Sequence, residues 1–358
     1  MPSGYHGKIL RVNLSSGALA VESPADNFYR RYLGGAGFVA YYLLKEVPPG
    51  TDALGPDNRL VFACGPVTGV PISGSGRNAI GALSPLTGAM GEADVGGFWG
   101  AELKAAGFDA IVVEGQASSP VYLWIHDGEA ELKDAGHLWG MENLETHTSI
   151  RQELGEARAR IALCGPAGER LVRYAAVVAD LKHVAGRCGL GAVMGSKKLK
   201  AVAVRGTSRP PLADAESVRS LGRWMRDNYR DIMGTFADLG TGVSVIPYNA
   251  EGALPVHNFR DGHIEGAEAI GREGLAEHVV VRMESCYACA VSCKKVVDLQ
   301  EPYAVDPAYG GPEYETAASI GSNCGITDVY AVSKANERLN ALGLDSISTG
   351  GTIAFAME

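Results

Sequence analysis

The sequence of 358 residues predicts an α+β fold whose first part is rich in strands and whose second part is mostly helical. Three observations predict this fold. Short strand-like runs between Gly-rich turns fill residues 8–206, whereas helical periodicity is clearest at 214–233 and 333–342. Strand-forming words also recur within the first part, which indicates an internal duplication. Hairpins mixed with scattered helices favour α+β over a doubly wound parallel sheet.

The first elements are a hairpin and a helix. Residues 9–14 and 18–22 alternate in the manner of strands on either side of a Ser-Ser-Gly turn. Asp26 can cap the amphipathic helix that follows, which we expect to continue past Gly34 and to end before Pro48.

Two later segments look like copies of each other. Residues 60–66, Leu-Val-Phe-Ala-Cys-Gly-Pro, are echoed at 161–166. Each copy continues with a Gly-Arg pair, at 76–77 and at 186–187, and then with a helix and a strand. We interpret this order as an internal duplication, with a chance match of short Gly-rich words as the alternative.

A hairpin and a boundary complete the organisation. The hairpin spans 121–132 around an Asp-Gly-Glu turn, and an amphipathic helix follows at 144–154. Gly, Ser and two prolines at 206–211 mark a boundary. We therefore predict a duplicated α+β domain over 1–208 and a helical domain over 209–358.

Composition excludes several classes of partner. The net charge is −9 and no basic run offsets it, which argues against nucleic acid and against an anionic membrane surface. No apolar run reaches the length of a bilayer span, and the first residues contain no apolar signal region. Seven cysteines, three of them clustered, fit a reducing compartment better than a disulfide framework. We expect a cytoplasmic protein whose partners are small molecules or other proteins.

The cysteine cluster is the strongest local signal for chemistry. Cys286, Cys289 and Cys293 place three soft thiolates at Cys-x2-Cys-x3-Cys spacing. Such a set suits an iron–sulfur cluster or zinc, both of which usually need a fourth protein ligand, and buried free thiols are the third reading. The sequence stops at Met357-Glu358, just after the apolar residues 353–356 and without a polar tail, so we expect a truncated product or a chain that another one completes.

Taken together, the motifs resemble the tungsten-dependent aldehyde:ferredoxin oxidoreductase family, matching its N-terminal and middle portion. Each motif alone is weak, but their order and spacing are specific. The motifs are residues 7–14, 84–88, 97–104, 185–187, the cysteine cluster, 311–315 and 343–345.

The resemblance implies a tungsten or molybdenum centre held by two pyranopterins, a [4Fe–4S] cluster and a magnesium ion that bridges the pterin phosphates. It implies that the first domain contains two pseudo-equivalent pterin-binding halves, which gives the duplication a reason. The implied activity is oxidation of aldehydes to carboxylic acids, with electrons passed through the cluster to ferredoxin or a ferredoxin-like subunit. A homodimer, or a completing C-terminal chain, is the expected assembly.

Two alternatives stay open. One is an aromatic acyl-CoA reductase-like enzyme, or another redox paralogue, on the same scaffold. The other is a catalytically inactive fragment that serves as a structural or assembly subunit.

The resemblance also assigns residues to the cofactors. It makes Cys286, Cys289 and Cys293 ligands of the cluster. It places five residues at the pterins, although an asparagine is more familiar at position 94: Arg77, Asp94, Gly96, Arg187 and Asp345.

Glu315 is the predicted catalytic residue. The resemblance places it beside the metal, where its carboxylate could take a proton from water that attacks an aldehyde. Without the resemblance, Glu313 and Glu315 would read as an acidic first helical turn after a proline. Cys324 is a minor candidate for an additional metal ligand, and His257 is a weaker candidate for proton transfer.

Overall fold

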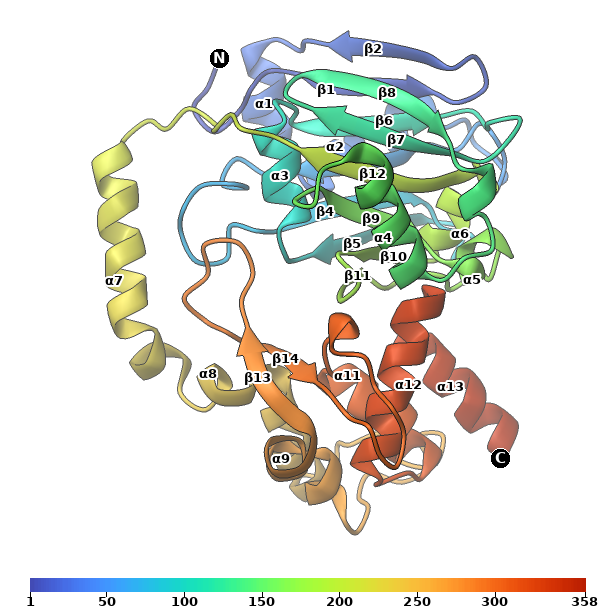
Figure 1. The fold of residues 1–358 in the computed structure, drawn as a ribbon, viewed down its shortest axis with the longest axis vertical. Helices are drawn as coiled ribbons and strands as arrows, with labels where there is room; N and C mark the ends of the chain where they lie inside the picture. The colour runs from blue at the N-terminus through green and yellow to red at the C-terminus, as the bar shows by residue number, and fades with distance from the viewer. The chain divides into compact units, whose positions relative to one another are not determined.

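The computed structural model describes residues 1–358 and divides them into two units. Unit 1 consists of Met1–Trp224 together with Cys286–Cys289, and unit 2 consists of Met225–Ser285 together with Ala290–Glu358. Strands dominate the first unit and helices the second (Figure 1), which confirms the predicted α+β class. The expected boundary at residue 208 stays a prediction.

Unit 1 contains two six-stranded sheets. The first has the order β2-β1-β6-β3-β4-β5, and its strands are β1 (Ile9–Asn13), β2 (Ala18–Glu22), β3 (Leu60–Cys64), β4 (Asn78–Leu83), β5 (Met90–Val95) and β6 (Ala110–Glu114). The second has the order β11-β10-β9-β12-β7-β8, and its strands are β7 (Val121–His126), β8 (Glu129–Asp134), β9 (Arg160–Cys164), β10 (Val177–Ala179), β11 (His183–Ala185) and β12 (Leu199–Arg205).

The two sheets repeat one topology. Adding six to each strand number of the first sheet gives the second sheet in reverse order. The pairing directions agree as well, since β1 with β6 and β7 with β12 are parallel while all the other pairs are antiparallel. The predicted duplication is therefore confirmed, with one repeat over β1–β6 and the other over β7–β12.

The predicted equivalence of the two Gly-Arg pairs is wrong. Gly76 and Arg77 precede β4, whereas Gly186 and Arg187 follow β11. The topological counterpart of the second pair is Gly96–Gly97, which follows β5. Glycine is needed at the ends of many strands, where the backbone turns or approaches another segment closely, so a short Gly-containing word does not identify its loop.

Six helices accompany the sheets: α1 (Asp26–Tyr32), α2 (Ala36–Glu46), α3 (Trp99–Ala105), α4 (Asn143–Leu154), α5 (Pro166–Glu169) and α6 (Leu190–Ser196). The single helix expected after Asp26 is instead two helices. Leu33 and Gly34 have φ values of 60° and 105°, which end α1 in the left-handed region and reverse the chain before α2. The helix expected at 144–154 is confirmed as α4.

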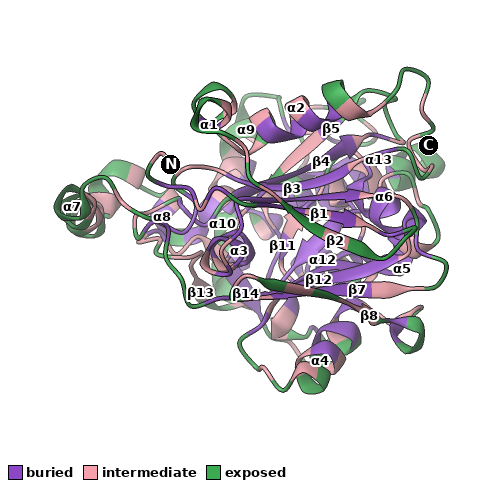
Figure 2. Cartoon of the chain, turned by 90° about the horizontal axis from the view of Figure 1, so that it is seen from above, coloured by how far each residue is buried: buried purple, intermediate pink, exposed green.

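The strands of the first sheet separate two cores. Leu60, Phe62 and Cys64 of β3 point into a core that also contains residues of the second sheet, so the two sheets pack face to face. Val61 and Ala63 point to the other face and pack against the buried side of α2. Figure 2 shows the resulting buried interior between the sheets.

Unit 2 is mostly helical, with one hairpin. The long helix α7 (Ala215–Met233), predicted from its periodicity, begins in unit 1, continues into unit 2 and has no buried residue. The other elements are α8 (Phe236–Leu239), α9 (Val245–Ala250), α10 (Arg272–Gly274), β13 (Val280–Glu284), β14 (Lys294–Val297), α11 (Tyr314–Thr316), α12 (Val329–Leu342) and α13 (Ser346–Met357). Single 3₁₀ or π turns occur at η1 (Gly136–Leu138), in unit 1, and in unit 2 at η2 (Gly240–Ser244), η3 (Ala267–Ile270), η4 (Leu275–Val279), η5 (Pro307–Tyr309), η6 (Ala317–Gly321) and η7 (Ser322–Cys324). No helix combines the length and the apolar character needed to cross a membrane.

Candidate functional site

Loops of unit 1 close around Cys286. The backbone N–H of Tyr287 donates to the carbonyl of Gly97 over 3.0 Å, and the Tyr287 hydroxyl donates to the carbonyl of Gly69 over 3.0 Å. A Cβ at Gly96 would lie 3.2 Å from the Cys286 sulfur. Because Gly96 has no side chain, the Cys286 thiol has space beside it.

Two more close approaches bring both repeats to the same place. A Cβ at Gly76 would lie 2.4 Å from the carbonyl oxygen of Gly97 and 3.3 Å from the Cβ of Tyr287. Gly97 has a φ of +94°, and a Cβ there would lie 2.5 Å from the imidazole of His183. The loop before β4, the loop after β5 and strand β11 of the second repeat thus meet beside the cysteine loop.

Three of the predicted pterin ligands, Arg77, Asp94 and Arg187, lie on these segments and are exposed. Arg77 follows directly on Gly76, and its carbonyl accepts a hydrogen bond of 2.7 Å from the Thr68 hydroxyl. Asp94 lies on β5, and Arg187 lies between β11 and α6. The structure thus brings the segments of Arg77, Asp94, Gly96 and Arg187 together, and their contacts with a pterin stay predictions.

The three clustered cysteines lie in the connection from β13 to β14. All three cysteines are half-buried and none forms a disulfide. Ala288 has a φ of 49°, which turns the chain so that the Cys289 N–H donates to the Cys286 carbonyl over 3.2 Å. Cysteine thiols in a tight turn are donors that fit a soft metal centre. Residues 1–358 hold no preformed group of three His, Cys, Asp or Glu side chains around one point. Cluster ligation therefore stays a prediction.

In unit 2, Glu313 is held far more firmly than Glu315. Its carboxylate accepts hydrogen bonds from Lys294 over 3.1 Å, from Lys295 over 2.9 Å and from the Thr241 hydroxyl over 2.5 Å. Burial alone would raise the pKa of Glu313, but the two ammonium groups and these hydrogen bonds lower it to about 2. Glu315 is exposed in the first turn of α11, where it is accessible to solvent.

Asp345 is buried and caps a helix. Its carboxylate accepts from the backbone N–H of Ile347 over 3.0 Å and from the Ser348 hydroxyl over 2.6 Å, so it satisfies the N-terminus of α13. This capping role is visible in the structure, and a role in pterin binding stays a prediction.

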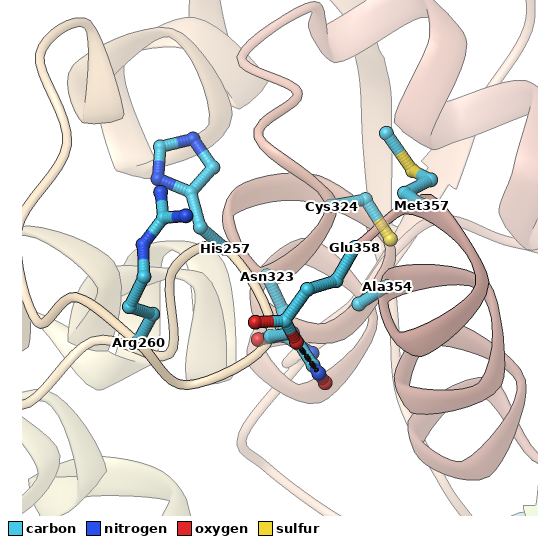
Figure 3. A pocket seen from close by; sticks show the side chains of 8 residues that line it. His257, Arg260, Asn323, Cys324, Ala354, Met357 and Glu358 are labelled. Carbon is cyan, nitrogen blue, oxygen red and sulfur yellow. Dashed lines mark hydrogen bonds between the residues drawn. The ribbon is translucent and has the colours of Figure 1, made fainter.

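A pocket of about 300 Å³ in unit 2 brings together two minor candidates from the sequence (Figure 3). Its lining consists of His257, Asn258, Arg260, Asn323, Cys324, Ala354, Met357 and Glu358. The amide of Asn258 donates to the carboxylate of Glu358 over 2.6 Å. Cys324 is buried, which raises the pKa of its thiol and favours the neutral form.

His257 lies in a strained turn of this pocket. His257, Asn258 and Phe259 have φ values of 48°, 55° and 62°, a conformation that costs roughly 1–3 kcal/mol for each non-glycine residue. Asn323 holds the turn, because its carbonyl accepts from Asn258 over 2.9 Å and its side-chain oxygen accepts from Phe259 over 2.9 Å. The Nδ1 atom of His257 lies 2.9 Å from the carboxylate of Asp261, which orients the imidazole.

Comparison with known proteins assigns the chain to a family. Residues 9–206 match the model of the aldehyde ferredoxin oxidoreductase N-terminal domain, and residues 220–358 match the model of domains 2 and 3 of the same family. The chain belongs to the aldehyde ferredoxin oxidoreductase family.

Three similar proteins are informative. The tungsten-containing aldehyde ferredoxin oxidoreductases of Thermococcus kodakarensis and Pyrococcus furiosus are 43% and 44% identical to the chain, over 99% of its length and 58% of theirs. The solved active site complex BamBC of benzoyl coenzyme A reductase, in complex with 1,5-dienoyl-CoA, has a TM-score of 0.88 and 30% identity and covers 100% of this chain and 56% of that one. The chain thus spans a little over half the length of these relatives.

Three residues of this family member were missed by the sequence reasoning. His183 is buried against Gly97, Glu313 joins the two lysines after Cys293, and Asp261 orients His257. His183 lies in the three-residue strand β11, which no sequence pattern indicated. The spacing of four residues between His257 and Asp261 is a common one and gave no signal.

Proposed function

We propose that this chain provides most of the cofactor-binding part of an enzyme that oxidises aldehydes to carboxylic acids at a tungsten- or molybdenum-bispyranopterin centre. Electrons would leave through a [4Fe–4S] cluster to ferredoxin or a ferredoxin-like subunit. The enzyme would act in the cytoplasm. The observation that supports this most is the meeting of glycine-lined loops from both repeats beside Cys286. The relatives in two archaea are named tungsten-containing aldehyde ferredoxin oxidoreductases, which supports the same activity.

The residues present supply part of the ligand set that this function requires. Cys286, Cys289 and Cys293 would hold the iron–sulfur cluster. The pterins, with a magnesium ion between their phosphates, would be held by Arg77, Asp94, Gly96, Arg187 and Asp345. When bound, the metal centre supplies Lewis acidity and redox capacity, and the cluster transfers single electrons.

The chain's own residues would handle protons. Glu315 is exposed and ionisable, so its carboxylate oxygen can accept a proton from a water molecule at the site. The His257 imidazole is fixed through Nδ1 by Asp261, which leaves Nε2 as the atom that would exchange a proton in the pocket.

The catalytic assignment is tested with Glu315→Gln. In protein purified after anaerobic expression with tungstate, we expect aldehyde-dependent dye reduction to fall by about 10²–10⁴-fold while tungsten content is unchanged. Full activity with stoichiometric tungsten would remove Glu315 from this role.

The cofactor-binding assignment is tested with Gly96→Ala. The added methyl group would lie 3.2 Å from the Cys286 sulfur, so we expect a lower iron content per chain. The matched control is Gly136→Ala, because a Cβ there would meet nothing closer than 3.6 Å. Equal iron in the two variants would contradict the placement of the cluster beside Gly96.

A second candidate function is reduction of an aromatic acyl-CoA thioester. The similarity to the benzoyl coenzyme A reductase complex favours it, as does the position of Cys324 in the pocket. Analysis of products with aldehydes and with aromatic thioesters separates the two functions. Turnover of thioesters alone, abolished by Cys324→Ser, would favour this second function.

A further inference from the structure

A partly buried ionic group includes the two residues that follow the third cysteine of the cluster in the chain. Strand β14 begins at the residue after Cys293, and its first two residues are Lys294 and Lys295. The Lys294 and Lys295 ammonium groups lie 3.1 and 2.9 Å from the two carboxylate oxygens of Glu313. Lys295 is fully buried, so its charge is not screened by water.

A second chain segment encloses Cys293 from another side. Gly240 has a φ of +58°, and a Cβ there would lie 2.6 Å from the carbonyl oxygen of Cys293 and 3.1 Å from its Cβ. This contact is as close as the backbone allows, because any side chain at position 240 would displace Cys293. The segment around Gly240 therefore fixes the position of the cysteine backbone.

Glu313 and Lys295 bind both of these segments. The Lys295 ammonium donates to the carbonyl of Leu239 over 3.1 Å, one residue before Gly240. The hydroxyl of Thr241, one residue after Gly240, donates to Glu313 over 2.5 Å. The pair thus ties the segment that packs on Cys293 to the strand that follows Cys293.

The charges of the group are unequal. Two ammonium groups face one carboxylate, so the group has a net charge of +1 when all three are ionised. The potential of an iron–sulfur cluster depends on nearby charge and on how its thiolates are held, because reduction adds one negative charge to the cluster.

We propose that Glu313 and Lys295 are a positioning pair that fixes Cys293 and sets the reduction potential of the iron–sulfur cluster. This inference rests on the proposed function, since it takes Cys293 as a cluster ligand. A fixed ammonium stabilises the reduced cluster and a fixed carboxylate destabilises it. The two members of the pair therefore shift the potential in opposite directions.

The test is a redox titration of the cluster, followed by electron paramagnetic resonance, in anaerobically purified protein with iron and acid-labile sulfide measured alongside. Glu313→Gln leaves two ammonium groups without a counter-charge, so the potential shifts in the positive direction. Lys295→Met removes one ammonium group, so the potential shifts in the negative direction. Asp298→Asn is the matched control, because this exposed carboxylate follows β14 and its loss leaves the potential unchanged.

The double variant Glu313→Gln/Lys295→Met keeps the test decisive if a single variant loses its cluster. It removes one charge of each sign, so we expect a cluster whose potential is close to that of the wild type. Opposite shifts in the single variants, or recovery of the cluster in the double variant, support the inference. A cluster with the same potential in all variants overturns it. A wild-type protein without iron or a paramagnetic signal overturns the proposed function itself.

Discussion

The two repeats of unit 1 share their strand topology and differ in how each anchors its last helix. In the first repeat, Lys104 of α3 stays within its own repeat and donates to Asp109 over 2.5 Å and to the carbonyl of Gly4 over 2.7 Å. In the second, Lys197 at the end of α6 reaches three carbonyls of the first repeat. These carbonyls are those of Pro56, Asn58 and Gly115, at 3.3, 2.7 and 3.0 Å.

The two repeats therefore have the same strand pairing although their buried polar contacts differ. Both lysines are fully buried, but only Lys104 has a charged partner. Burial, with a smaller effect from Arg59, lowers the pKa of Lys197 to about 7. One topology thus tolerates an ion pair within a repeat and a lysine bound only to uncharged carbonyls between repeats.

The largest effect is expected from Asp109→Ala. The substitution leaves the buried Lys104 ammonium without a counter-charge and removes the acceptor for the backbone N–H groups of His6 and Gly7. Loss of one partner of a buried pair costs about 3–5 kcal/mol. Denaturant unfolding at neutral pH measures this change in the free energy of unfolding. The exposed Glu129→Ala serves as the control, with an expected change within about 0.5 kcal/mol.

Lys197→Met is expected to cost less. It removes three hydrogen bonds to neutral carbonyls but leaves no unpaired charge, so we expect about 1–3 kcal/mol by the same unfolding measurement. A cost equal to that of Asp109→Ala would mean that the two anchors are energetically alike despite their different partners.

The pH dependence of stability separates the anchors further. Between pH 7 and 10.5, the unfolded chain keeps a proton on Lys197 that the folded chain has lost, so the free energy of unfolding increases with pH. The gain is fully present above the ordinary lysine pKa and is lost as the pH falls through about 7. Subtracting the profile of Lys197→Met isolates this contribution. Parallel profiles for the two proteins would show that the ammonium stays protonated throughout this range.

Much of the fold could be predicted from local sequence. The hairpin at 9–22, the helix at 215–233 and the duplication depend on short-range periodicity, which the residues display directly. The positions of the two Gly-Arg loops could not be predicted in this way, because Gly76–Arg77 and Gly186–Arg187 follow strands that are not counterparts in the two repeats. A glycine indicates that another segment can approach the backbone closely, but it does not indicate which segment does so.

The firmly held glutamate is a second case of the same limit. Glu313 and Glu315 flank one tyrosine and are alike in local sequence, yet only Glu313 is bound by Lys294, Lys295 and Thr241. Thr241 is 72 residues away along the chain, so no spacing rule connects the two. The choice between neighbouring carboxylates is made by tertiary contacts that sequence periodicity does not contain.

The smallest effect on stability is expected from an ion-pair network that occurs in the first repeat and not in the second. Arg11 of β1 binds Glu46 through two hydrogen bonds, of 2.9 and 2.7 Å, and Arg59 binds the same carboxylate over 3.1 Å. The second repeat instead pairs the buried Lys200 with Glu169. Arg11 and Glu46 keep 22% and 18% of their side-chain surface exposed, so water weakens the pair.

A double-mutant cycle with Arg11→Ala and Glu46→Ala measures the coupling within this network. We expect about 0.5–1 kcal/mol at low ionic strength, and a smaller value near 1 M sodium chloride, where the Debye length falls to roughly 3 Å. Glu46→Ala also releases Arg59, whereas Arg11→Ala also releases Glu22 and Glu114, so only the coupling term isolates the Arg11–Glu46 pair. A coupling of several kcal/mol that salt does not change would instead show that this network is as well shielded from water as the pair of Lys104 and Asp109. In that case the buried and the half-exposed charges of the first repeat would contribute to stability in the same way.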